Sequence, residues 1–185
     1  MATGLPAARK LARLDAEAIH GDLRDTTAVR EAARQSDAVI HLAMESSSAA
    51  VALDRALIDA VVAALQPSGK PFIYTSGIWV MGSTAGQVAD ESTPVNHTPL
   101  VAWRPAHEQL VLHAAGVRGI VIRPAMVYGG SGGFLREFVL APNTQGAVRY
   151  IGSGENRWPF VHVDDLADLY VRALQASPAR RASPW

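Results

Sequence analysis

The amino-acid sequence predicts an α/β protein built on a parallel sheet. Apolar, strand-like runs alternate with helix-like segments along the chain, which is the order that βαβ units produce. The runs DAVIHLA (37–43) and PFIYTS (71–76) are almost continuously apolar, as is typical of strands covered on both faces. At 185 residues, 49% of them hydrophobic, the chain suffices for one ordinary core. We therefore expect one partial domain over residues 1–176 and a disordered tail at 177–185.

In the N-terminal half, helices and strands are expected to alternate. The expected elements are a short helix at 6–14, a strand at 16–23 that runs into a Gly-Asp turn, a helix at 26–36 capped by Asp25, and the strand at 37–43. A longer helix then spans 49–66. Its apolar stripe consists of Leu53, Leu57, Val61 and Leu65, whereas Asp54, Arg55 and Asp59 lie off that stripe.

In the C-terminal half, the strand at 71–76 precedes a long loop that ends near Thr98. Pro105 fits the first turn of a helix, so the next helix is expected from about Arg104 to Gly116. The elements expected after it are a buried strand at 119–125, a glycine-rich loop, a helix at 134–140, a strand at 147–151, and a helix that follows FVHV and is capped by Asp164.

Composition and charge argue against several classes of function. Lys plus Arg and Asp plus Glu number 17 each, so no basic surface is available for nucleic acid or an anionic membrane. The chain has no cysteine, no His-x-x-x-His pair and no apolar stretch long enough to cross a bilayer. Its first residues lack the apolar run of a secretory signal. We expect a cytoplasmic protein with no metal site and no nucleic-acid or membrane partner.

Five sequence motifs occur in the order and spacing of one known family. They are HGDLRD (20–25), DAVIHLA (37–43), FIYTSGIWVMG (72–82), GIVIRPAMVYGG (119–130) and FVHVDDLADLYVRAL (160–174). Together they resemble the extended short-chain dehydrogenases/reductases, the NAD-dependent epimerase/dehydratase group, and most of all its atypical subgroup. The resemblance implies a Rossmann-like, doubly wound parallel sheet that binds NAD or NADP.

The resemblance also assigns candidate cofactor-binding residues by position. On the adenine side these are Asp22 and Leu23; along the dinucleotide cleft, His41, Leu42 and Ala43; and beside the nicotinamide, Thr75, Ser76 and Pro124. Ligands of such sheets bind beyond the carboxyl ends of the strands, where all of these positions are expected. Taken alone, Asp22 would be an ordinary turn residue and His41 a core histidine.

The acid/base pair that the family uses is absent. Active members carry Tyr-x-x-x-Lys. The lysine brings the pKa of the tyrosine phenol toward neutrality, so that the tyrosine can act as an acid and base, and it also holds the ribose. Alignment on Glu108 places Leu100 and Arg104 at those two positions, while spacing alone would select Trp103 and His107. Arg104 either holds a ribose or phosphate as a constant cation or is a solvated residue at a helix start.

Other catalytic motifs are also incomplete. Gly77 stands where the family has the Ser or Thr that polarises the substrate oxygen, and glycine has no side chain for that task. GGSGG (129–133) fits Gly-x-Ser-x-Gly, but it lacks the strand-to-helix turn and the following acid and histidine of a hydrolase. GSGENR (152–157) lacks the third glycine of a dinucleotide fingerprint. We assign no catalytic residue and expect this chain to be inactive alone.

The family opens with a strand, a Gly-x-x-Gly-x-x-Gly loop, a helix and a second strand, and these 185 residues show none of them. We expect an internal fragment with an incomplete Rossmann-like sheet, in which the first two strands and the glycine-rich loop are missing. The segment before about residue 25 should then be detached from the main sheet or paired beside Val39. Because the loop holds the pyrophosphate, NAD(P) binding should be weak or absent, no better than millimolar.

Three interpretations remain open. The first is a truncated NAD(P)-dependent oxidoreductase whose intact relative acts on a small-molecule carbonyl or sugar-like substrate. The second is a non-catalytic nucleotide-sensing or protein-binding module, and the third is a gene fragment without function. If the relative is a homodimer, the helices at 49–66 and 104–115 should form a four-helix interface, so the stripe on the first helix faces either the sheet or that partner.

Overall fold

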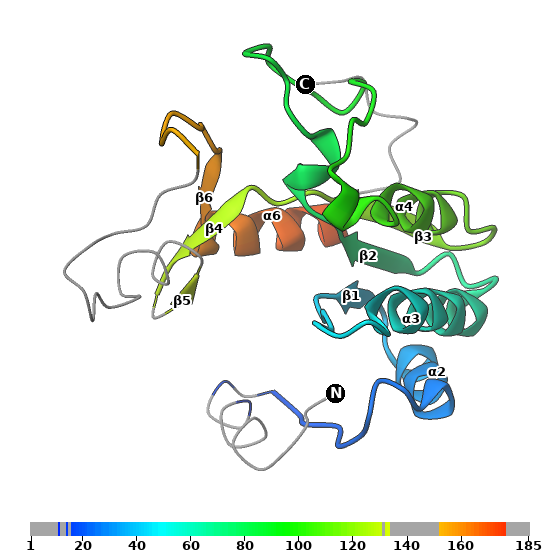
Figure 1. Ribbon diagram of the computed structural model, residues 1–185. Coiled ribbons are helices and arrows are strands. Elements are labelled where there is room, and N and C mark those ends of the chain that lie inside the picture. Colours follow the sequence, from blue (N-terminus) through cyan, green and yellow to red (C-terminus); the bar gives the residue numbers. More distant parts are fainter. Residues whose placement is uncertain (1–10, 12–13, 15, 131, 134–151, 177–185) are drawn as a thin grey trace. The chain divides into compact units, whose positions relative to one another are not determined.

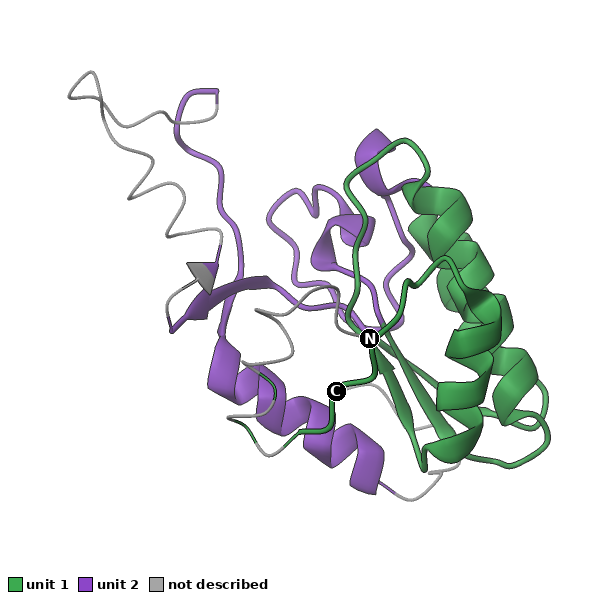
Figure 2. Ribbon diagram, turned by 90° about the horizontal axis from the view of Figure 1, so that it is seen from below, with its two compact units in different colours: residues 1–74, 103–121 green, residues 75–102, 122–185 purple. Residues whose placement is uncertain are grey.

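The computed structural model describes residues 11, 14, 16–130, 132–133 and 152–176. The expected helices at 6–14 and 134–140, the strand at 147–151 and the tail at 177–185 lie wholly or largely outside the described residues. The chain forms two compact units, shown in different colours in Figure 2. The first unit comprises Met1–Tyr74 and Trp103–Val121, and the second comprises Thr75–Ala102 and Ile122–Trp185.

A three-stranded sheet and three helices form the first unit (Figure 1). The sheet has the order β1-β2-β3, with β1 (Val39–His41), β2 (Pro71–Thr75) and β3 (Arg118–Ile122). The helices are α2 (Thr26–Gln35), α3 (Ala50–Leu65) and α4 (Arg104–Leu112). β1 and β2 are parallel, with Val39 opposite Phe72 and His41 opposite Tyr74. The parallel α/β fold expected from the apolar runs is confirmed.

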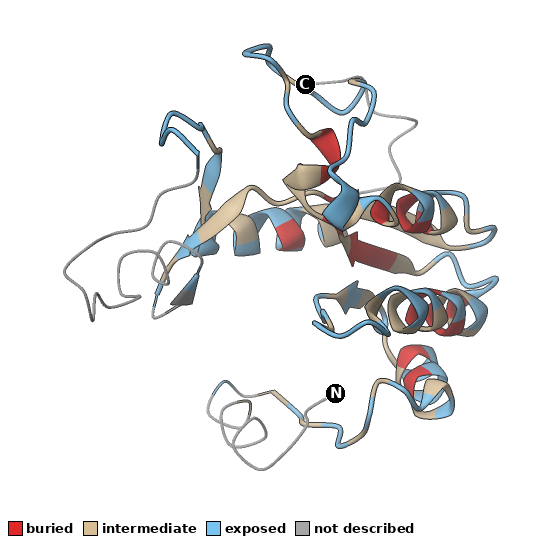
Figure 3. Cartoon of the chain, in the orientation of Figure 1, coloured by how far each residue is buried: buried red, intermediate tan, exposed pale blue. Residues whose placement is uncertain are grey.

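The core of the first unit lies between the helices and β2. Helix α3 packs against both α2 and α4, and the three helices lie on one face of the sheet (Figure 2). Buried positions gather on α3, α4 and β2 (Figure 3). The core cluster is Val29, Ala33, Leu57, Ile58, Ala60, Val61, Leu65, Phe72, Tyr74 and Val111. The apolar stripe of α3 therefore faces the protein's own core.

The segment at 16–23 is not the strand that the sequence predicts. Among the described residues, β1 pairs with β2 alone, and only His20 in this segment makes a strand-type bridge. Asp25 does cap α2, because its carboxylate accepts hydrogen bonds from the backbone N–H groups of Thr27 and Ala28. The described residues at 16–24 form no strand beside Val39, which is opposite Phe72 of β2.

The second unit contains a second small sheet, of order β5-β4-β6, which the sequence did not predict. The strands of this sheet are β4 (Met126–Gly129), β5 (Gly132–Gly133) and β6 (Phe160–His162). The unit also contains the 3₁₀ turns Ile78–Met81 and Pro99–Val101 and helix α6 (Val163–Gln175). β4 and β6 are parallel neighbours. Gly129 has φ +110°, and a Cβ there would overlap the ring of His162, so this position requires glycine.

The start of α6 corrects the prediction that Asp164 caps it. The helix begins at Val163 and its N-cap is His162, two residues earlier than the predicted cap. The His162 ring accepts a hydrogen bond from the backbone N–H of Asp164. Asp164 and Asp165 instead lie in the first turn, where their charges favour the positive end of the helix dipole.

Candidate functional site

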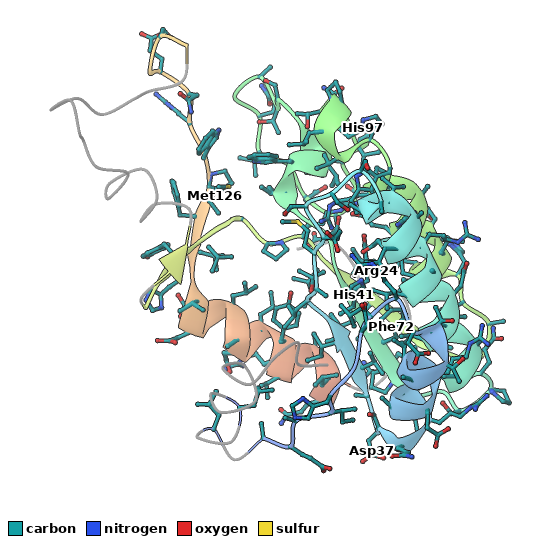
Figure 4. The ribbon with its side chains drawn as sticks, turned by 60° about the horizontal axis from the view of Figure 1, so that its bottom comes forward. Arg24, Asp37, His41, Phe72, His97 and Met126 are labelled. Atoms are coloured by element: carbon teal, nitrogen blue, oxygen red, sulfur yellow. The ribbon has the colours of Figure 1, made fainter. Side chains whose placement is uncertain are left out.

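A cavity of about 290 Å³ lies in the first unit, beyond the carboxyl end of β1. The loop after β1, the first turns of α3 and the turn before α2 provide its walls. Its lining residues are Asp22, Leu23, Arg24, His41, Ala43, Met44, Glu45, Ala50, Leu53, Asp54 and Leu57. Figure 4 labels Arg24 and His41, two of these residues. Open parallel sheets bind their ligands at such strand ends, so we take this cavity as the candidate site.

Arg24 joins two carboxylates of the lining, the exposed Asp22 and the half-buried Glu45. One guanidinium nitrogen lies 3.0 Å from Glu45 Oε2, and another lies 3.3 Å from Asp22 Oδ2. The backbone N–H of Arg24 also donates to Asp22 Oδ1 at 2.8 Å. This backbone hydrogen bond, with the nearby guanidinium charge, lowers the pKa of Asp22. The wall formed by the turn before α2 is therefore held by ionised groups of both signs.

A second polar group is built around the carboxylate of Asp54 on α3. Its Oδ1 lies 3.0 Å from Nε2 of His41, and its Oδ2 accepts from Nδ1 of His107 at 2.7 Å and from the Tyr74 hydroxyl at 2.9 Å. Burial opposes the charge of this carboxyl, but the hydrogen bonds from the two histidines and Tyr74 outweigh it, and the pKa of Asp54 is lowered. Asp54 therefore connects β1, α3, β2 and α4.

Arg104 is buried, with 9% of its surface exposed. Its guanidinium lies 3.5 Å from the Tyr74 hydroxyl and 3.7 Å from the sulfur of Met44, and it stacks over the Trp103 ring at 4.6 Å. The interpretation of Arg104 as a solvated residue is therefore wrong. Burial, and secondly the charge of Asp54, raises the pKa of Tyr74 far above its usual range, so Tyr74 acts as a constant donor.

The structure brings together four of the candidate cofactor residues. Asp22, Leu23, His41 and Ala43 all line the 290 Å³ cavity. Leu42 does not line it; its side chain belongs to a second cavity of about 550 Å³ that runs along β1 and α2. Arg104 lies outside the lining but contacts Met44, which is part of it.

The remaining candidates belong to the second unit and are described within it. Thr75 shares a hydrogen bond of 2.7 Å with the hydroxyl of Tyr170, and the carbonyl of Pro124 accepts from the N–H of Ile78 at 3.0 Å. Ser76 is buried, and among the described residues its hydroxyl has no hydrogen-bond partner. The backbone of Gly77 is extended, with φ −175°, so any residue could adopt it.

Sequence reasoning missed the role of Asp54. The helical period placed it with Arg55 and Asp59, which are indeed exposed and form an ion pair of 2.8 Å. Asp54 instead turns inward, with 11% of its side chain exposed. One signal for this site was available in the sequence. The spacing of Tyr-x-x-x-Lys selects His107 on α4, and His107 donates a hydrogen bond to the Asp54 carboxylate. Arg24, Met44 and Glu45 carried no comparable signal in the sequence.

The described part of the chain offers neither a metal site nor a membrane-spanning helix. No group of three or more His, Cys, Asp or Glu side chains there could hold a metal ion. Among the same residues, no helix combines the length and the apolar character that crossing a membrane requires.

Comparisons with known proteins agree on one family. The model of the NAD-dependent epimerase/dehydratase family matches residues 3–182. A protein of Schizosaccharomyces pombe is 32% identical over 165 residues, which cover 86% of this chain and 56% of that protein. A protein of Saccharomyces cerevisiae is 30% identical over 179 residues, which cover 91% of this chain and 59% of that protein. The chain thus spans less than two thirds of the length of these relatives.

Solved structures show the same fold. The dTDP-glucose 4,6-dehydratase of Bacillus anthracis, in complex with NAD, aligns with a TM-score of 0.72 at 16% identity, covering 86% of this chain and 54% of that one. A variant of UDP-glucuronic acid 4-epimerase from Bacillus cereus, in complex with a substrate analogue and NAD, gives a TM-score of 0.72 at 17% identity, covering 91% and 60%. With the family match over residues 3–182, the chain belongs to the NAD-dependent epimerase/dehydratase family.

Proposed function

We propose that this chain carries the adenosine side of an NAD(P) site in an oxidoreductase-like protein of this family. The observation that carries the proposal is the shared cavity of Asp22, Leu23, His41 and Ala43. Its volume of about 290 Å³ lies at the lower end of the range of small-molecule pockets. That size suits one nucleoside portion of a dinucleotide rather than the whole molecule. The chemistry of the lining fits as well, because the carboxylate of Asp22 can accept from an exocyclic amine.

The whole protein would act on a small carbonyl or sugar-like substrate. Support comes from two similar structures whose ligands are sugar nucleotides: one contains UDP-glucose and NAD, and the other a UDP-sugar analogue and NAD. The nicotinamide of the bound cofactor would exchange hydride with such a substrate. In this chain, Arg104 would contribute a constant positive charge for binding, and the fully buried Tyr74, whose hydroxyl lies 3.5 Å from that guanidinium, would orient it.

A second candidate function is a non-catalytic nucleotide-sensing module. It is favoured by the residues at the positions of the family's acid/base pair. Leu100 is 69% exposed and apolar, and Arg104 is enclosed by Tyr74, Met44 and Trp103. Neither residue can donate and take back a proton, so the chain offers nucleotide contacts without the family's usual chemistry.

Titration of the ¹⁵N-labelled chain with NAD tests the proposal. The amides of Asp22, Leu23, His41 and Ala43 are expected to shift together and to saturate at a common concentration. An Asp22→Ala variant should weaken this response, and Asp59→Ala, an exposed change on the far side of α3, should leave it unchanged. Absence of any saturable shift at these four amides, with NAD raised well above millimolar concentration, would contradict the assignment. Turnover with a carbonyl panel separates the enzymatic from the sensing function.

A further inference from the structure

The protonation pattern of His41 follows from its partner. Nε2 of His41 lies 3.0 Å from Asp54 Oδ1, and the ionised Asp54 has no proton to donate. Nε2 must therefore carry the proton of a neutral His41 ring, which leaves Nδ1 as a bare acceptor. Among the described residues, His41 makes no other hydrogen bond. His41 lines the cavity, and its Nδ1 is not among the fully buried, unpartnered side-chain atoms of the described residues, so this acceptor is open to a ligand there.

Asp54 holds a second histidine in the opposite form. His107 meets Oδ2 through Nδ1, at 2.7 Å, so Nδ1 rather than Nε2 carries its proton. His107 is not part of the cavity lining, and its ring packs against Trp103 with centroids 5.0 Å apart. Of the two histidines on this carboxylate, His41 alone reaches the cavity.

The other polar side chains of the lining are also mainly acceptors. Asp22 and Glu45 are carboxylates, and Asp54 shows part of its surface to the same space. Arg24 is the only cation among the described lining residues, and it is already bonded to both Asp22 and Glu45. A phosphate placed beside Arg24 would meet these two carboxylates and be repelled.

We propose that His41, oriented by Asp54, is a specificity-determining acceptor of this cavity, which selects a nucleoside portion with amino donors and a free ribose hydroxyl that carries no phosphate. The proposal rests on the proposed function and deepens it, since it assigns the cavity to NAD in preference to NADP. A ribose hydroxyl donates to Nδ1 of His41, and the carboxylates of Asp22 and Glu45 accept from the ligand's remaining donors. Asp54 is a positioning residue, because it acts on the ligand through His41.

The first experiment needs no ligand. In ¹⁵N spectra of the imidazole rings at pH 8, His41 should be protonated at Nε2 and His107 at Nδ1, two opposite tautomers in one protein. Loss of each signal in His41→Gln and His107→Asn variants assigns them. Asp54→Asn, whose amide can donate to Nε2, should convert His41 to the Nδ1–H form. A wild-type His41 protonated at Nδ1 would overturn the proposal, whatever the chain binds.

The second experiment compares adenosine, NAD and NADP, each titrated well above millimolar concentration and followed by the amide shifts of the cavity. NAD should bind at least tenfold more tightly than NADP. In His41→Gln, the amide keeps the donor to Asp54 and lacks the acceptor at Nδ1, so adenosine binding should fall about two- to tenfold. His113→Gln is the matched control, since His113 is exposed and bonds its own helix carbonyl.

The two proposals fail in different ways. If none of the three ligands produces a saturable shift, the nucleotide site itself is wrong and both proposals fall. If adenosine binds but His41→Gln binds it equally well, or NADP binds as tightly as NAD, only the role of His41 is overturned. A thermal melt of His41→Gln close to that of the wild type excludes unfolding as the cause of weaker binding.

Discussion

At the scale of single residues, Asp54 has the most consequences for stability. Three donors from three different elements converge on its two oxygens, and its side chain is 11% exposed. Removing one member of such a buried group leaves the others without partners, which costs more than the hydrogen bonds contribute. The nearby exposed pair of Arg55 and Asp59 provides a comparison on the same helix.

Asp54→Ala should lower the free energy of unfolding by about 3–5 kcal/mol, because His41, His107 and Tyr74 lose their shared acceptor. Asp59→Ala should change it by about 0.5 kcal/mol or less. Urea unfolding of both variants measures the difference. The pKa of Asp54 is lowered in the folded state, so its contribution is present above the ordinary value of 3.8 and is lost as the pH falls through the folded pKa. A gap between wild type and Asp54→Ala that is the same at pH 5 and pH 3 would contradict this assignment.

Substitutions at the adjacent residues Ser76 and Thr75 are expected to change stability in different ways. Ser76→Ala removes a buried hydroxyl that has no partner among the described residues, so stability should stay the same or rise slightly. Thr75→Val removes the partner of the Tyr170 hydroxyl and should cost about 1–3 kcal/mol. Thermal unfolding of the two variants tests both. A loss above about 1 kcal/mol for Ser76→Ala would show that its hydroxyl has a partner.

At the scale of elements, the starts of α2 and α6 differ in how they are capped. Asp25 accepts two backbone N–H groups at the start of α2, whereas Asp164 lies inside the first turn of α6 and accepts none of them. Asp25→Ala should therefore lower the free energy of unfolding by about 1 kcal/mol. Asp164→Ala should lower it only by the weaker helix-dipole contribution of about 0.3–1 kcal/mol. Amide exchange in the first turn of each helix localises the effect. Faster exchange in α6 than in α2 after the matched substitutions would contradict the capping assignment.

The sequence predicted those elements whose signal is local. The apolar runs at 37–43 and 71–76 and the helices at 26–36 and 49–66 are present, because period and capping act within a few residues. The strand expected at 16–23 failed because a strand needs a pairing partner, and its own residues do not contain one. The short β4 and β6 were missed for the same reason, since parallel pairing across a long separation leaves no local pattern.

The candidate site was predictable only in part. Family motifs indicated Asp22, Leu23, His41 and Ala43, and these four share a cavity. Asp54 could not be placed, because its partners His41 and His107 are 13 and 53 residues away and a helical period reports only which side of a helix is apolar. Buried polar groups of this kind override the period wherever hydrogen bonds compensate their burial.

At the scale of the whole molecule, the affinity for the cofactor depends on what the 185 residues lack. They contain no Gly-x-x-Gly-x-x-Gly loop, whose backbone N–H groups and helix dipole hold a pyrophosphate. Hydrogen bonds to charged groups contribute about 1.5–3 kcal/mol each, so losing two weakens binding at least a hundredfold. This chain should bind NAD or NADP no better than millimolar. A dissociation constant in the low micromolar range by calorimetry would refute that expectation.

The first unit is built from two separate stretches of the chain, and this affects how it folds during synthesis on the ribosome. Helix α3 is complete once Leu65 has been made, but its neighbour α4 comes from Trp103–Val121, after a stretch that belongs to the second unit. A nascent chain emerges N-terminal end first, so part of the apolar face of α3 stays uncovered until Val111 leaves the exit tunnel. During that interval we expect the growing polypeptide to bind chaperones that recognise exposed hydrophobic helices.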